Sequence, residues 1–271
     1  MSNLNQSTMR ALALLALAIA IILGGYFYQN SRQAASVTLD TAASSTDGMF
    51  SAVAPGQDTT RGTTNIIPIT AEATYKSPAY PKTLSFSIKL SDSEKSTIQK
   101  AYGVVVGDLT EDRYDFNAWI NLGTLNLMAG NYKAAETIWQ FASTQWPTNQ
   151  ASHNNLGDLY MNYLKDYPKA ETEYLAGIKN KPGDPNPYKN LFTMYSDTSY
   201  KPTNTAAEDI LRKGITAVPT SVDLKYMLAV WYKKLGRTQE ATAQFQTAIN
   251  EANKQGLTQV AAQIKTDAGI K

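Results

Sequence analysis

Apolar and polar positions divide the chain into three stretches of different character. Residues 11–28 are almost uniformly apolar, and residues 31–75 contain 14 serines and threonines in 45 positions. From Ser91 onward, apolar residues recur with the spacing of amphipathic helices. The pattern therefore predicts a membrane-spanning helix, a linker and an all-α domain, in that order.

The first stretch has the length and composition of a membrane anchor. No charged residue interrupts the 21 positions between Arg10 and Arg32, and aromatic residues close the apolar run at Tyr26–Tyr28. An 18-residue helix is about 27 Å long, close to the roughly 30 Å of a bilayer core. A buried core helix is one alternative, and a cleaved signal peptide is another. Cleavage requires small residues soon after the apolar run, where this chain has bulky ones.

We therefore expect a tail at residues 1–10 and an uncleaved transmembrane signal anchor at residues 11–30 that contacts the lipid bilayer. Arg10 and the terminal amine precede the apolar run, while Arg32 follows it, so the charge asymmetry is small. A first hydrophobic segment so near the N-terminus favours a cytoplasmic N-terminus. The remainder of the chain is then predicted on the outer side of the membrane.

Residues 31–90 are rich in serine, threonine and alanine. Phe50 is the only aromatic residue of this stretch before Tyr75, so the segment has little apolar surface to offset the entropy of ordering. We expect a mostly disordered linker. Two short apolar pieces, residues 66–69 and 84–88, are candidates to dock as extended strands.

Beyond the linker the chain repeats itself four times with a period of 34 to 37 residues. Leucine recurs at a fixed place in the first helix of each unit, followed in three of the four by a small residue, and alanine recurs in the second helix. The aligned leucines are Leu122, Leu156, Leu191 and Leu228, and the aligned alanines are Ala135, Ala170, Ala207 and Ala241. Prolines close the first three units at Pro147, Pro182 and Pro219. A fixed period of this length is typical of solenoid proteins.

These residues resemble the tetratricopeptide repeat (TPR) family, whose unit is a 34-residue helix–turn–helix with Trp, Leu, Gly, Tyr, Ala, Phe, Ala and Pro at set offsets. The resemblance implies an all-α TPR solenoid within residues 91–271. It implies repeats at about 116–149, 150–184, 185–221 and 222–255, closed by capping helices at 92–108 and 258–270. One residue is inserted before Tyr167, about three are inserted in 197–204, and Phe192 stands where a small residue is expected.

Composition removes most kinds of enzymatic chemistry. The chain has no cysteine and one histidine, His153, which excludes thiolate metal sites, cysteine nucleophiles and multi-histidine metal centres. Residues 56–62 contain glycines but lack the Gly-Lys-Ser/Thr ending of a phosphate loop. The net charge of +2 is too small to indicate a nucleic-acid partner. We therefore expect that the protein is not an enzyme and that it binds no cofactor, no metal and no small-molecule substrate.

The resemblance also implies where a partner binds, because TPR proteins usually hold ligands in the concave groove lined by the first helix of each repeat. Asn121, Asn155 and Asn190 share one offset of that helix, where an amide either bonds a peptide backbone or, as a consensus residue of the family, has a local structural role. Variable groove offsets supply the other candidates, and the full candidate set is Asn121, Asn154, Asn155, Asp158, Asn162, Lys189, Asn190, Tyr226 and Lys233.

Charge is distributed unevenly along the repeats. Residues 92–224 carry 12 basic and 16 acidic side chains, whereas residues 225–271 carry 7 and 3. Such a gradient orients a partner more than it provides affinity. The sequence thus predicts a membrane-anchored adaptor for a protein or peptide partner, similar to bacterial envelope TPR proteins. The alternative is a structural accessory subunit of an envelope, secretion or pilus assembly complex.

Overall fold

The computed structural model describes residues 77–270, and in this range all regular secondary structure is helical, with no strand. The helices are α2 (Asp92–Glu111), α3 (Phe116–Met128), α4 (Tyr132–Gln145), α5 (Gln150–Leu159), α6 (Tyr167–Asn180), α7 (Asn186–Asp197), α8 (Ala206–Ala217), α9 (Val222–Lys234), α10 (Thr238–Lys254) and α11 (Thr258–Ala268), with a π-helical turn η1 (Tyr160–Leu164) after α5. The all-α prediction is confirmed for these residues.

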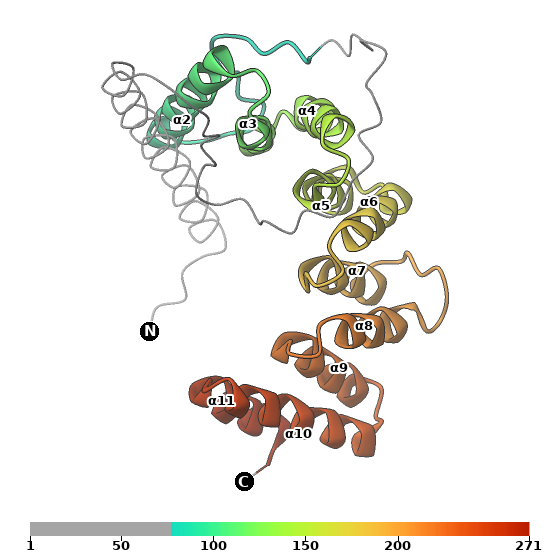
Figure 1. The fold of residues 1–271 in the computed structure, drawn as a ribbon. Coiled ribbons are helices and arrows are strands. Elements are labelled where there is room, and N and C mark those ends of the chain that lie inside the picture. The colour runs from blue at the N-terminus through green and yellow to red at the C-terminus, as the bar shows by residue number, and fades with distance from the viewer. Residues whose placement is uncertain (1–76, 271) are drawn as a thin grey trace, which may run out of the picture.

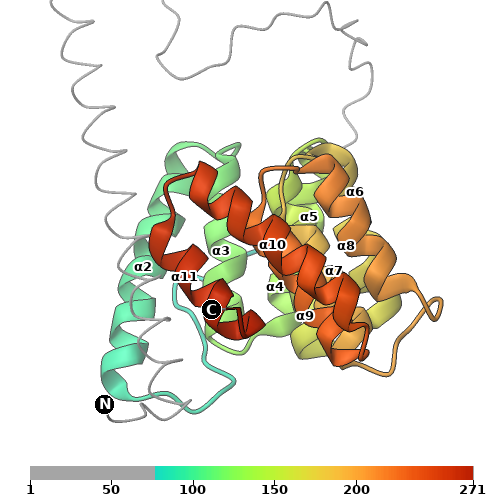
Figure 2. The same ribbon diagram turned by 90° about the horizontal axis from the view of Figure 1, so that it is seen from below.

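The helices pack as consecutive pairs: α3 with α4, α5 with α6, α7 with α8, and α9 with α10. Each pair falls inside one of the four expected repeat ranges. The pairs stack into an arc, so that α2 and α11, at opposite ends of the stack, lie on the same side of it (Figures 1 and 2). A helix pair of this length cannot bury its apolar face alone, and the stacked neighbours provide the core.

Within a pair, a glycine of the first helix faces a large ring of the second. A Cβ added at Gly123 would lie 2.2 Å from Nε1 of Trp139, and one at Gly157 would lie 2.5 Å from Cε1 of Tyr174. Both rings are fully enclosed. The missing side chains therefore set the close approach of α3 to α4 and of α5 to α6.

Adjacent repeats are joined by a polar side chain at the fourth position of the repeat. Trp119 Nε1 donates to the carbonyl of Arg113 at 2.9 Å, and Tyr188 OH donates to that of Pro182 at 3.1 Å. Lys225 Nζ donates to the carbonyl of Pro219 at 2.5 Å and also meets Glu251 at 2.8 Å. His153 holds the same position in its repeat, six residues after Pro147. Three different side chains thus reach back six residues to the segment that precedes their own repeat.

The ends of the stack are helices without a partner of their own. A capping box of Ser91 and Glu94 starts α2, at the first residue of the capping helix expected at 92–108. This helix continues to Glu111, beyond the expected end at residue 108, because Leu109 is buried and extends its apolar face. At the other end, α11 stops at Ala268 rather than at residue 270, where Gly269 takes a left-handed conformation with φ of 71°.

Residues 77–90 form an extended segment that packs against α2 and α3. Leu84 is buried, Ser87 N donates to the carbonyl of Ala129 at 2.8 Å, and Tyr102 OH donates to that of Pro81 at 2.8 Å. The ring of Tyr80 lies edge-on to Trp119 at 5.7 Å. The linker expected up to residue 90 is therefore wrong for residues 77–90, because these apolar side chains and backbone groups find partners on the helices. The docking expected for residues 84–88 is present, without a strand.

The two insertions seen in the sequence take different forms. The extra residue before Tyr167 is accommodated by the π-helical turn η1 at the end of α5. Lys165, which directly follows η1, has a left-handed conformation with φ of 56°. The extra residues of the third repeat form the loop between α7 and α8, at residues 198–205. Tyr200 of this loop donates to Glu171 Oε2 at 2.5 Å, and Tyr195 of α7 donates to Oε1 of the same carboxylate.

The predicted anchor at residues 11–30 and the linker to residue 76 lie outside the described residues. Among the residues that are described, no helix is both long and apolar enough to cross a membrane.

Candidate functional site

The first helices of the repeats, α3, α5, α7 and α9, form one continuous surface, which we call the inner face. Side chains connect its helices in succession: Asn190 Nδ2 of α7 donates to Asp158 of α5 at 2.9 Å, and Lys189 of α7 pairs with Asp223 of α9 at 3.2 Å. The inner face follows the concave side of the arc (Figure 1). The predicted candidates on α3, α5, α7 and α9 therefore share one surface.

Asp158 is the most enclosed of these candidates. Its Oδ1 accepts bonds from the hydroxyl of Tyr174 at 2.5 Å and from Asn190 at 2.9 Å. Burial raises the pKa of this carboxyl above its usual range, while the bond from Tyr174 acts in the opposite direction. Asp158 thus holds α5, α6 and α7 together, and its oxygen is already engaged by the fold.

The asparagines differ in what they offer. Asn121 and Asn155 are half-buried, and Asn162 is exposed on η1. The Oδ1 atom of Asn154 is buried and has no hydrogen-bond partner among the described residues; it lies where a Cβ of Gly177 would be. Asn162 is therefore the most exposed of these four.

Tyr226 and Lys233 are engaged by the C-terminal cap. The hydroxyl of Tyr226 donates to Asp267 Oδ2 at 2.8 Å, and Lys233 Nζ donates to the Asp267 carbonyl at 2.7 Å. Asp267 lies in the last turn of α11, so this helix continues the inner face as its last member. The predicted site residues Asn190 and Asp158 are joined by a hydrogen bond between α7 and α5. Tyr226 and Lys233, both on α9, are brought together because each bonds Asp267.

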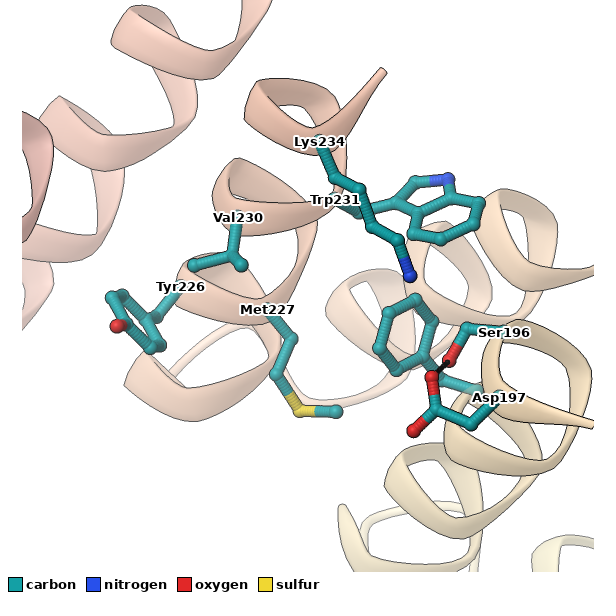
Figure 3. Close-up of a pocket in the computed structure, with 8 residues that line it drawn as sticks. Ser196, Asp197, Tyr226, Met227, Val230, Trp231 and Lys234 are labelled. Atoms are coloured by element: carbon teal, nitrogen blue, oxygen red, sulfur yellow. Dashed lines mark hydrogen bonds between the residues drawn. The ribbon is translucent and has the colours of Figure 1, made fainter.

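Between α7 and α9 the inner face is hollowed, with a cavity of about 230 Å³. Its lining is mostly apolar and comes from two adjacent repeats: Phe192, Ser196, Asp197, Tyr226, Met227, Val230, Trp231 and Lys234 (Figure 3). Val230 is 40% exposed and contributes to an apolar patch at the cavity wall. We call this cavity the α7–α9 hollow.

The hollow exists because the third repeat departs from its neighbours. Phe192 takes the place of Gly123 and Gly157 in the first helix, and Leu211 takes the place of the ring in the second. Leu211 is fully buried, whereas Phe192 is half-buried and turns toward the next repeat. Its ring meets Trp231 edge-on, with centroids 5.6 Å apart and planes at 89°. In the third repeat the aromatic ring therefore lies on the inner face, whereas in the first two repeats it lies inside the helix pair.

Sequence reasoning marked Phe192 as a departure but assigned no role to Trp231 or Met227. Both lie in α9 at positions next to the variable groove offsets. The sequence signal that could have identified them is a pair of large apolar residues, four positions apart, on the helix face that also carries Val230. In the described chain, no cluster of three or more His, Cys, Asp and Glu side chains is placed to hold a metal.

Comparisons with known proteins agree on the fold. No model of a known protein family matches the chain, and no curated protein matches it. Among solved structures, yeast Tom70 is similar with a TM-score of 0.51 and 18% identity, over 64% of this chain and 37% of Tom70. MamA gives 0.48 and 16%, over 62% of this chain and 99% of MamA. TTC0263, a TPR protein of Thermus thermophilus, gives 0.44 and 19%, over 62% and 91%.

At these identities the likeness concerns the fold alone. Together with the four stacked helix pairs, the similarity to Tom70 shows that the described residues have a TPR-type fold.

Proposed function

We propose that this chain is a protein–protein interaction scaffold that binds a protein or peptide partner on its inner face, with the α7–α9 hollow as the main point of attachment. One observation carries the proposal: apolar and aromatic side chains, including Val230 at 40% exposure, gather in a cavity on the concave side of the stack. Partly exposed rings in a cavity are typical of residues that dominate protein interfaces.

The proposal also includes a membrane anchor at residues 11–30, with the solenoid on the outer side. Its support comes from the sequence: an uncharged apolar run of bilayer length that ends in three aromatic residues. The protein should then stay in the membrane fraction after alkaline extraction. Protease added to sealed spheroplasts should digest the solenoid; protection until lysis would reverse the orientation.

The binding face is tested by proximity labelling of the full chain in its native cell, followed by mass spectrometry. Val230→Glu places a charge in the hollow and should remove the labelled partner. Leu175→Glu is the matched control, because Leu175 is also 40% exposed but lies on α6, a second helix of a repeat. Circular dichroism checks that both variants stay folded.

The two variants also separate the alternative function. A structural accessory subunit that braces an assembly through its outer helices would lose its partner with Leu175→Glu and keep it with Val230→Glu. That result would contradict binding on the inner face.

A further inference from the structure

The α7–α9 hollow already contains a positive charge supplied by the protein itself. Lys234 reaches from the end of α9 across the opening, and its ammonium lies 5.4 Å from the centre of the Trp231 ring (Figure 3). The faces of aromatic rings carry negative charge and attract cations, most strongly for tryptophan. Because Lys234 is exposed and its side chain is long, it can move aside without disturbing the core.

The opposite wall carries a negative charge. Asp197, the last residue of α7, lines the hollow with an exposed carboxylate that accepts a bond from Ser196 Oγ at 2.8 Å. Figure 3 shows this carboxylate beside the aromatic wall, on the side away from Lys234. A cation held in the hollow beside these rings would therefore share the cavity with an acidic group.

Helix ends add to the same preference. Ser196 and Asp197 belong to the last turn of α7, and Trp231 and Lys234 belong to the last turn of α9. The C-terminus of a helix carries about half a negative charge, and two such ends flank the hollow. An aspartate at a helix C-terminus is unfavourable by itself, so an external cation there relieves repulsion.

The nearby lysines do not cancel this field. Lys189 is paired with Asp223 at 3.2 Å, and the ammonium of Lys233 donates to the Asp267 carbonyl. Among the residues that line the hollow, one carboxylate and one ammonium balance each other. Once Lys234 moves aside, the lining is left with a net negative charge.

We propose that the α7–α9 hollow binds a basic side chain, lysine or arginine, of the partner protein, which replaces the ammonium of Lys234 beside Trp231 and pairs with Asp197. Met227 and Val230 contact the aliphatic stem of that side chain. This inference rests on the proposed binding at the inner face and specifies its chemistry. An uncharged apolar side chain would use the same walls but would gain nothing from Asp197 or from the helix ends.

The test compares two short peptides that differ only in charge at one position, one with arginine and the other with citrulline, its uncharged isostere. The full chain carries ¹⁵N-tryptophan, and the indole N–H signal of Trp231, assigned with Trp231→Phe, reports binding. At physiological ionic strength the arginine peptide should bind about tenfold more tightly, as expected for a ring contact and an exposed ion pair together. Equal affinities would overturn the proposal and leave binding on the inner face intact.

Two charge variants test the assigned roles. Lys234→Met removes the internal competitor, so the arginine peptide should bind about threefold or more tightly, whereas Lys233→Met should change little. Asp197→Asn should weaken the arginine peptide about threefold and leave the citrulline peptide unchanged, while Asp209→Asn on α8 is the control. Weaker binding by Lys234→Met, or no shift of the Trp231 signal with either peptide at millimolar concentration, would refute the assignment.

Discussion

The contact between Gly123 and Trp139 predicts a large loss of stability from a single added methyl group. In Gly123→Ala the new Cβ would lie 2.2 Å from Nε1 and 2.6 Å from Cδ1 and Cε2 of Trp139. The indole is 2% exposed, and its Nε1 donates to the Ile120 carbonyl at 3.1 Å, so it has no room to move aside. The pair must therefore separate or give up this bond.

The magnitude follows from three contributions to the free energy of unfolding. Overpacking a core costs about 1–3 kcal/mol, and losing the indole hydrogen bond costs about 1 kcal/mol. Replacing glycine by alanine inside a helix stabilises the folded state by about 1 kcal/mol through helix propensity. We expect Gly123→Ala to lower the free energy of unfolding by about 2 kcal/mol, or the melting temperature by about 4–8 °C for a domain of this size.

The assay is urea unfolding followed by circular dichroism at the helix band. Gly103→Ala is the matched control, because Gly103 lies within α2 and a Cβ there meets no atom within 4 Å. That variant should gain about 1 kcal/mol from helix propensity alone. If Gly123→Ala proves as stable as Gly103→Ala, the close approach of α3 and α4 does not depend on the missing side chain.

Two further predictions concern single positions in the second repeat. The bond from the protonated His153 ring to Glu173 at 2.8 Å raises the pKa of this histidine above 6.5, so its stabilisation is complete below about pH 6.5 and is lost as the pH rises through the folded-state value. The free energy of unfolding of the wild type, relative to that of His153→Gln, should therefore fall as the pH rises above about 6.5, and parallel pH profiles would contradict this. Lys165→Gly should raise the melting temperature by the equivalent of about 0.5–1 kcal/mol, because Lys165 has φ of 56°; a lower melting temperature would show that its side chain matters more than its backbone.

The sequence predicted the described helices because each helix end is determined by residues that lie at that end. Gly130 and Gly236, which directly follow the C-caps of α3 and α9, have φ of 81° and 73°, a conformation that glycine adopts readily. The inserted residue before Tyr167 was visible as a shift of period, but its form was not. A single extra residue fits a loop or a widened helical turn equally well, and packing of Tyr160 in the core selected the turn η1.

The hollow was harder to predict because its walls come from different repeats. Phe192 and Trp231 are 39 residues apart in the chain, so no repeat by itself shows that they meet. Tyr226 and Lys233 were expected to be open because the alignment ends before α11, whose Asp267 binds both. Docking of residues 77–90 was underestimated for a related reason: composition averages over a segment, whereas Leu84 needs only one apolar site on α2 and α3.

The bonds from the fourth position of the repeat have a consequence for how the solenoid folds. In the first, third and fourth repeats this bond joins a side chain to a carbonyl only six residues earlier, at Arg113, Pro182 and Pro219. Closing so short a loop costs little chain entropy, and local contacts of this kind are typical of fast-folding proteins. The boundary between two repeats can therefore form almost as soon as the helix that follows it. Assembly can begin at any repeat and extend in either direction along the chain, without waiting for its distant ends to meet.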